Sequence, residues 1–216
     1  MADYAPITRE DLRVALARDL RDPDMKTFTD LTINDLINQS IVEVSRIYPR
    51  QGVIEILVEA SGQRQFTVDA KNIFRVELIK DGEVYYGVPR TNGSMTAAED
   101  GWDFHAGILW MPQFASHRLE VGDSTPSVRI WGYWPREIMY DDTETLDGDA
   151  EFEFAVRTYA LLLGYQRLQN DRLLFQQWLT TTGNTDVSPN QLGMTADMYM
   201  SQWRELRNRL RGMQRV

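Results

Sequence analysis

The sequence predicts an α+β fold. N- and C-terminal helices pack together, a small antiparallel β-sandwich or barrel module is inserted between them, and an extended helical arm follows at the C-terminal end. Three observations predict this fold. Apolar residues recur at helical spacing near both ends of the chain, whereas the middle alternates with a period of two residues. The chain has 216 residues and is 43% hydrophobic, which is enough to bury a sizeable core.

Residues 1–50 are expected to form two helices. Thr8 and Asp11 have the spacing of an N-cap residue and its N3 partner, and apolar residues follow at helical spacing. A second such pair, Thr32 and Asp35, is expected to open the next helix, which Pro49 ends.

Residues 51–137 are expected to form the β-module. Asp81-Gly82 between two alternating segments is a strong hairpin signal, and a second hairpin is expected around Ser61-Gly62. About seven short strands favour a sandwich or barrel over βαβ units. A long polar loop over residues 89–107 is expected to be functional or mobile. The candidate strands are VIEILVE, RQFTV, IFRVELIK, EVYYGV, GILWM, RLEV and VRIWGYW.

The rest of the chain returns to helical spacing. Residues 138–182 are expected to form an acidic linker and one long helix, in which Gly164 marks a close-packing point or a bend. Residues 183–216 are expected to form a linker and a docking arm, whose helix starts at Thr195.

The composition excludes several classes of function. The chain contains no cysteine, so it has neither disulfides nor Cys-ligated metal sites. The common nucleotide-binding, hydrolase and zinc-protease motifs are absent. The two histidines, His105 and His117, lie in or beside loops without evident partners. We therefore expect no enzyme activity, no cofactor and no metal.

The chain start and the charge indicate the compartment. MADYAPITRED lacks the basic and apolar regions of a signal peptide, and no apolar run approaches the roughly 18 residues of a membrane helix. We therefore expect a protein made in the cytoplasm that does not enter a membrane. A net charge of −9 argues against general nucleic-acid binding.

A dense acidic run precedes the long helix. Counted from Asp142, Gly148 falls at position seven, so the run does not match an EF-hand. Three interpretations of the run stay open. It is a solvated linker whose last acids stabilise the N-terminus of the following helix, a divalent-cation site of a different kind, or a docking face for a neighbour's arginines. The acids assigned to this face are Asp141, Asp142, Glu144, Asp147 and Asp149.

The last helix carries an apolar seam with arginines beside it. Its apolar residues step by four and three, as in a coiled-coil seam, and most of the arginines follow them by one residue, about 100° round the helix. Either the seam packs on the chain's own core, or it docks on another chain. The residues assigned to a docking arm are Tyr199, Trp203, Arg204, Leu206, Arg207, Leu210, Arg211, Met213 and Arg215.

Several segments, taken in order over about residues 8–170, resemble the head-to-tail adaptor (connector or neck) proteins of tailed bacteriophages. They are TREDLRVALARDL, TINDLINQSIVEVSRIYP, GQRQFTV, IFRVELIKDGE, RIWGYWP and EFAVRTYALLLGYQRL. The resemblance implies a structural virion protein that is made in the host cytoplasm and placed at the head–tail junction. It also implies a ring, typically a dodecamer, that joins the portal to tail or nozzle proteins and lets DNA pass during genome ejection.

The resemblance assigns expected roles to the two patterned segments. The C-terminal arm is expected to dock on the portal protein, with Trp203 and Leu206 as anchors. The acidic run is expected either to line the DNA channel by like-charge repulsion or to receive a neighbour's arginines. The alternative function is a carbohydrate- or small-ligand-binding β-module with helical flanks. Its aromatic platforms would be Trp102, Phe104, Trp110, Trp131 and Trp134.

Overall fold

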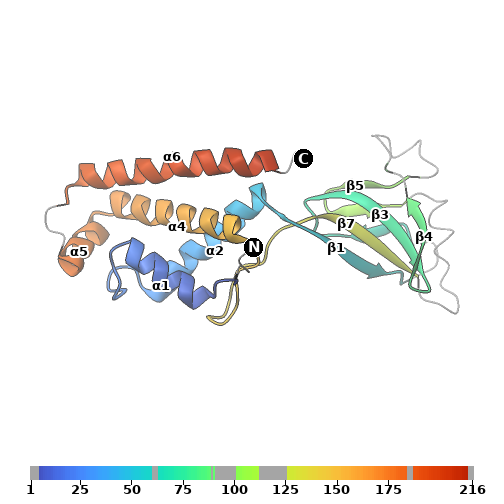
Figure 1. Ribbon diagram of the computed structural model, residues 1–216, viewed down its shortest axis with the longest axis horizontal. Helices are drawn as coiled ribbons and strands as arrows, with labels where there is room; N and C mark the ends of the chain where they lie inside the picture. The colour runs from blue at the N-terminus through green and yellow to red at the C-terminus, as the bar shows by residue number, and fades with distance from the viewer. Residues whose placement is uncertain are drawn as a thin grey trace. The chain divides into compact units, whose positions relative to one another are not determined.

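The computed structural model describes residues 5–59, 63–88, 90, 101–111, 126–183 and 187–213, the side chains of Tyr85, Tyr86 and Met213 excepted. It confirms the α+β fold class, with helices and antiparallel sheets (Figure 1). The chain divides into two compact units. The helical unit comprises Met1–Tyr48 and Arg136–Val216, and the β-unit comprises Pro49–Pro135.

The first two helices of the helical unit are α1 (Arg9–Asp19) and α2 (Asp30–Ile47). Thr8 caps α1 as predicted, because its hydroxyl accepts a hydrogen bond from the backbone N–H of Asp11 at 3.1 Å. The predicted start of α2 is wrong by one turn. Thr29 caps this helix and accepts from the N–H of Thr32 at 3.3 Å, so Thr32 already lies inside the helix.

A buried carboxylate organises the connection between α1 and α2. The side chain of Asp22 accepts hydrogen bonds from the backbone N–H groups of Lys26 (3.1 Å), Thr27 (2.8 Å) and Phe28 (2.7 Å). Asp22 is only 2% exposed. Arg21 adopts a left-handed backbone conformation with φ of 57° just before it. The connection is therefore a tightly hydrogen-bonded loop that holds Arg21 in a defined place.

The C-terminal part of the unit contains α4 (Ala150–Asn170), α5 (Arg172–Thr182) and α6 (Pro189–Met213). The predicted single long helix is wrong, because Asp171 ends α4 and caps α5 through the N–H groups of Leu173 and Leu174. Helix α6 begins at Pro189 rather than Thr195. Proline suits the first turn of a helix, where its missing N–H has no partner to lose.

Helix α6 belongs to the hydrophobic core of the helical unit and does not extend as a separate arm. It runs beside α4 (Figure 1), where the Tyr159 and Trp203 rings lie 4.7 Å apart and the Tyr165 and Tyr199 rings 5.4 Å apart. Gly164 is the predicted close-packing point, since a Cβ there would lie 2.6 Å from Leu20 Cδ2. Both ends of the chain therefore contribute to one core.

The β-unit contains two antiparallel sheets. One has the strand order β1-β7-β3-β4 and the other the order β2-β6-β5. The strands are β1 (Arg50–Leu57), β2 (Gln65–Thr67), β3 (Asn72–Lys80), β4 (Glu83–Val88), β5 (Asp103–His105), β6 (Ile108–Trp110) and β7 (Ser127–Trp134). One buried cluster includes Phe66 and Leu109 from the smaller sheet and Val76 and Ile130 from the larger, which makes the unit a sandwich.

The strand pairing differs from the prediction in two places. The β3–β4 hairpin is confirmed, and Asp81 and Gly82 both have positive φ, as its tight turn requires. The hairpin expected around Ser61-Gly62 is wrong, because β1 pairs with β7 and β2 with β6. Part of the predicted 89–107 loop forms β5, and residues 89 and 91–100 lie outside the described residues, as does the expected RLEV strand.

Candidate functional site: an interaction surface

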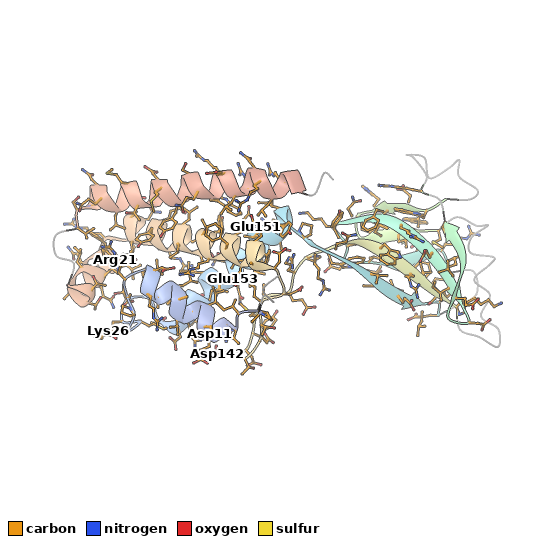
Figure 2. All side chains as sticks on the ribbon, in the orientation of Figure 1. Asp11, Arg21, Lys26, Asp142, Glu151 and Glu153 are labelled. Carbon is orange, nitrogen blue, oxygen red and sulfur yellow. The ribbon has the colours of Figure 1, made fainter. Side chains whose placement is uncertain are left out.

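The acidic run between the β-unit and α4 folds into a turn held against α1. The carboxylate of Asp142 accepts hydrogen bonds from Arg13 Nη1 and Nη2, at 2.7 and 2.9 Å, and from Arg9 Nε and Nη2, at 3.1 and 2.9 Å. The hydrogen bonds from Arg13, and then those from Arg9, lower the pKa of Asp142 from 3.8 to about 2. Figure 2 labels Asp142 beside α1. Asp142 therefore joins the turn to the first helix.

Two further residues fix the same turn. Asn38 of α2 donates to the carbonyl of Met139 at 3.0 Å and accepts from its N–H at 3.1 Å. The carboxylate of Glu144 accepts from the N–H groups of Tyr140 and Asp141, at 2.5 and 3.2 Å. Residues 139–144, called the clamped turn below, thus present the Tyr140 side chain, 72% exposed, and the exposed Asp141 on a rigid support.

The remaining acids of the run also have partners within the chain. Arg136 donates to the carbonyl of Asp147 at 2.5 Å, and its guanidinium lies 3.9 Å from the Asp147 carboxylate. Asp149 caps α4 and accepts from the Tyr48 hydroxyl at 2.9 Å. The position of Asp149 at the N-terminus of α4 agrees with the interpretation of the acidic run as a linker whose last acids stabilise that helix end. Asp142, Asp147 and Asp149 are therefore engaged within the chain, and a role for this run in receiving a neighbour's arginines or in lining a channel stays a prediction.

Replacing Asp142 by asparagine is expected to make the free energy of unfolding depend less on pH in the acidic range. Its pKa is lower in the folded chain than in the unfolded one, so its stabilisation is present above the ordinary value of 3.8 and is lost as the pH falls toward about 2. Urea midpoints of Asp142→Asn measured through this window should fall less steeply than those of the wild type. Asp141→Asn is the control. If the urea midpoint of Asp142→Asn fell with pH as steeply as that of the wild type, the result would contradict the hydrogen bonds from Arg9 and Arg13 to Asp142.

The seam assigned to the docking arm is buried in the chain's own core. Trp203 is 4% exposed, and Leu206 and Leu210 are also buried, so none of them is a free anchor for another protein in this structure. Arg204 and Arg211 are exposed, whereas Arg207 is half-buried. Tyr199 is half-buried against Tyr165. The Met213 side chain and Arg215 lie outside the described residues. A docking role for the arginine flank of α6 stays a prediction.

The aromatic platforms of the alternative function are corrected in part. Trp102 and Trp134 are buried in the core of the β-sandwich, at 1% and 8% exposure. The indole N–H of Trp131 donates to Glu77 at 3.2 Å, and the Arg75 guanidinium lies 5.9 Å from the same ring. Phe104 is partly buried against this core. Trp102 and Trp134 therefore pack the sandwich, whereas Trp110 and Trp131 are half-buried.

Other sites considered from the sequence have little support in the described residues. Within them, no group of three or more His, Asp or Glu side chains is arranged to hold a metal ion. His105 is exposed on β5, and His117 lies outside the described part. None of the described helices is long and apolar enough to cross a membrane.

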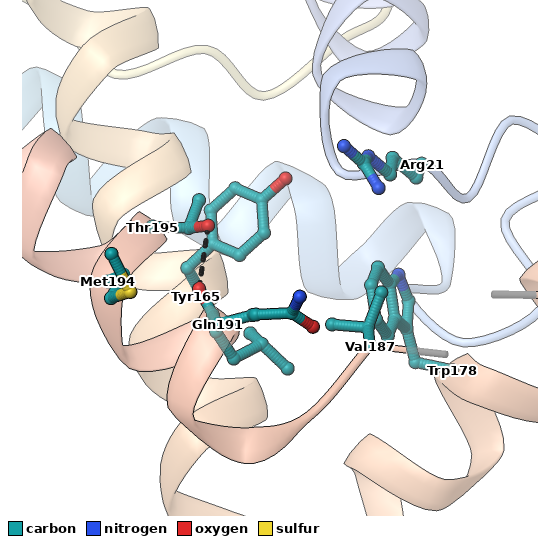
Figure 3. Close-up of a pocket in the computed structure, with 8 residues that line it drawn as sticks. Arg21, Tyr165, Trp178, Val187, Gln191, Met194 and Thr195 are labelled. Carbon is teal, nitrogen blue, oxygen red and sulfur yellow. Dashed lines mark hydrogen bonds between the residues drawn. The ribbon is translucent and has the colours of Figure 1, made fainter. Parts of the chain in front are cut away.

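A cavity lies near the C-terminal end of α1, where Arg21 follows the helix, and is called the Arg21 cavity below; the sequence did not indicate it. It has a volume of about 450 Å³, and Arg21, Tyr165 of α4, Trp178 of α5 and Gln191 of α6 are among the residues that line it (Figure 3). Burial raises the pKa of Tyr165 to about 12, and its hydroxyl donates to the carbonyl of Asp19 at 3.0 Å. These residues come from four separate segments, so no local pattern could have revealed the cavity.

The chain matches none of the protein-family models searched, and a search of curated proteins returns no significant match. The function is therefore inferred from the residues and from the geometry of these surfaces.

Proposed function

We propose that the protein is a structural virion subunit, a head-to-tail adaptor that forms a ring between the portal and the tail of a bacteriophage. The observation that carries the proposal is the clamped turn, a rigid support that presents an aromatic ring and a carboxylate outside the core. Exposed aromatic residues on rigid supports are characteristic anchors of protein interfaces. The order of the adaptor-like segments along the chain also supports it.

A ring requires each copy to carry two different, complementary surfaces. A heterologous contact closes into a ring when its rotation divides the circle, and twelve copies would match the symmetry of a dodecameric portal. The helical unit has surfaces of opposite charge that can serve such contacts. The clamped turn presents Asp141, and the connection after α1 presents Arg21.

The portal and tail contacts are assigned to different parts of this ring. Because the apolar seam of α6 is used internally, the proposed portal contact is the exposed arginine flank of that helix. Tail or nozzle proteins would bind elsewhere on the ring. The net charge of −9 favours a channel that repels the DNA phosphates and lets the genome pass without holding it.

Cosedimentation with portal rings from the same source tests the portal contact. The variant Arg204→Glu/Arg211→Glu is expected to bind portal rings more weakly than the wild type, on the order of tenfold, because it reverses two exposed charges at the contact. Its thermal unfolding should match that of the wild type, because both side chains are exposed. Charge reversal is preferable to truncation at Gly193, which would remove Trp203 from the core.

Gln202→Glu is the control for position, because it makes another exposed residue of α6 acidic, with a charge change of −1 against −4 for the double reversal. This control should pellet with portal rings as the wild type does. Wild-type protein that is folded yet fails to bind portal rings would overturn the proposed function. Equal binding by the wild type and the double charge reversal would overturn only the assignment to α6.

A further inference from the structure

The clamped turn presents two side chains that the chain itself does not use. Within the described residues, the Asp141 carboxylate makes no hydrogen bond or ion pair, and the Tyr140 ring is 72% exposed. Their backbone N–H groups are nevertheless fixed by Glu144. Little conformational entropy would be lost when this pair binds a partner, because its backbone is already ordered.

The Arg21 cavity has the complementary chemistry. Its rim carries the Arg21 guanidinium, which makes no hydrogen bond or ion pair within the described part of the chain. Asp19, an acid of the same chain segment, is already paired with Arg157 at 2.7 Å. Trp178, Leu192 and the exposed Met194 give the cavity an apolar lining. It therefore suits an aromatic side chain with a neighbouring carboxylate.

These two features cannot meet within one molecule. The clamped turn is bonded to Arg9 at the start of α1, whereas Arg21 follows the end of that helix. The 11 residues of α1 span about 16 Å at 1.5 Å per residue. Figure 2 shows Asp142 and Arg21 at different ends of α1. A contact between them must therefore join two copies, and in the proposed ring it joins them head to tail.

We propose that the Tyr140 side chain of one copy inserts into the Arg21 cavity of the next copy, where Asp141 pairs with Arg21. The inference rests on the proposed ring, and it names the residues of the contact between subunits. A cavity of about 450 Å³ has room for a phenol ring. Arginine can bind a carboxylate through two parallel hydrogen bonds, which would set the register of the contact.

Site-specific cross-linking tests the contact directly, since the chain contains no cysteine of its own. Thr143→Cys places a thiol on the clamped turn, and Met194→Cys places one at the rim of the cavity. When the two purified variants are mixed and oxidised, we expect their disulfide heterodimer to form on the order of tenfold faster than in the control mixture. The control pairs Thr143→Cys with Asn208→Cys, an exposed position elsewhere on α6. Equal rates in the two mixtures would overturn the proposal.

Charge exchange provides the second arm of the experiment. Arg21→Asp and Asp141→Arg should each weaken self-association, measured by sedimentation velocity over a concentration series, on the order of tenfold. The double variant carries the exchanged pair in every contact, so it should recover most of the loss. Folded single variants that associate as the wild type does, or a folded double variant that recovers nothing, would overturn the pairing.

The two proposals fail in different ways. Loss of portal binding by the wild type, with the cross-link intact, would remove the adaptor function and leave the contact between copies. Portal binding without the specific cross-link would remove this contact and leave the adaptor function.

Discussion

Replacing Trp203 by alanine is expected to lower the free energy of unfolding by about 3–5 kcal/mol. The side chain is 4% exposed, and its ring lies 4.7 Å from that of Tyr159. The substitution would leave a large cavity between α4 and α6 that neighbouring side chains can fill only partly. Urea unfolding followed by far-UV circular dichroism measures the loss.

Met194→Ala is the matched control for this experiment. Met194 lies on the same helix but is 73% exposed, so its substitution should leave the unfolding midpoint near that of the wild type. A Trp203→Ala variant with wild-type stability and lost portal binding would contradict the core position of Trp203 and restore it as a docking anchor.

Replacing Asp22 by alanine is expected to destabilise the protein by about 3 kcal/mol or more. The Asp22 carboxylate accepts hydrogen bonds from three backbone N–H groups, and Thr27 and Phe28 are themselves buried. Without the carboxylate these buried donors lose their acceptor, and water has little access to replace it. The shift in the urea midpoint gives the magnitude.

Asp24→Ala tests whether the effect is specific to the buried carboxylate. Asp24 lies two residues further along the same connection, and its carboxylate pairs with the exposed Lys26 ammonium at 2.8 Å. Its substitution should therefore change the midpoint little. A comparable loss for the two alanine variants would show that the connection depends on its overall charge rather than on the hydrogen bonds of Asp22.

The candidate site could be predicted from the sequence only in part. The acidic run was recognised as a distinct segment, but the partners of Asp142 were not, because Arg9 and Arg13 precede it by about 130 residues. The Arg21 cavity was missed for the same kind of reason, since segments distant in the sequence line it. The arginine flank of α6 followed directly from helical spacing, and its exposed members are Arg204 and Arg211.

The sequence by itself determined the local features of this protein. Thr8 caps a helix, Asp81-Gly82 closes a hairpin, and the change of apolar period separates helices from strands, because each depends on residues a few positions apart. Only the tertiary structure decided which strands pair and that the α6 seam lies in the chain's own core. An apolar seam has the same spacing whether it packs on its own chain or on a partner, so spacing alone could not distinguish the two.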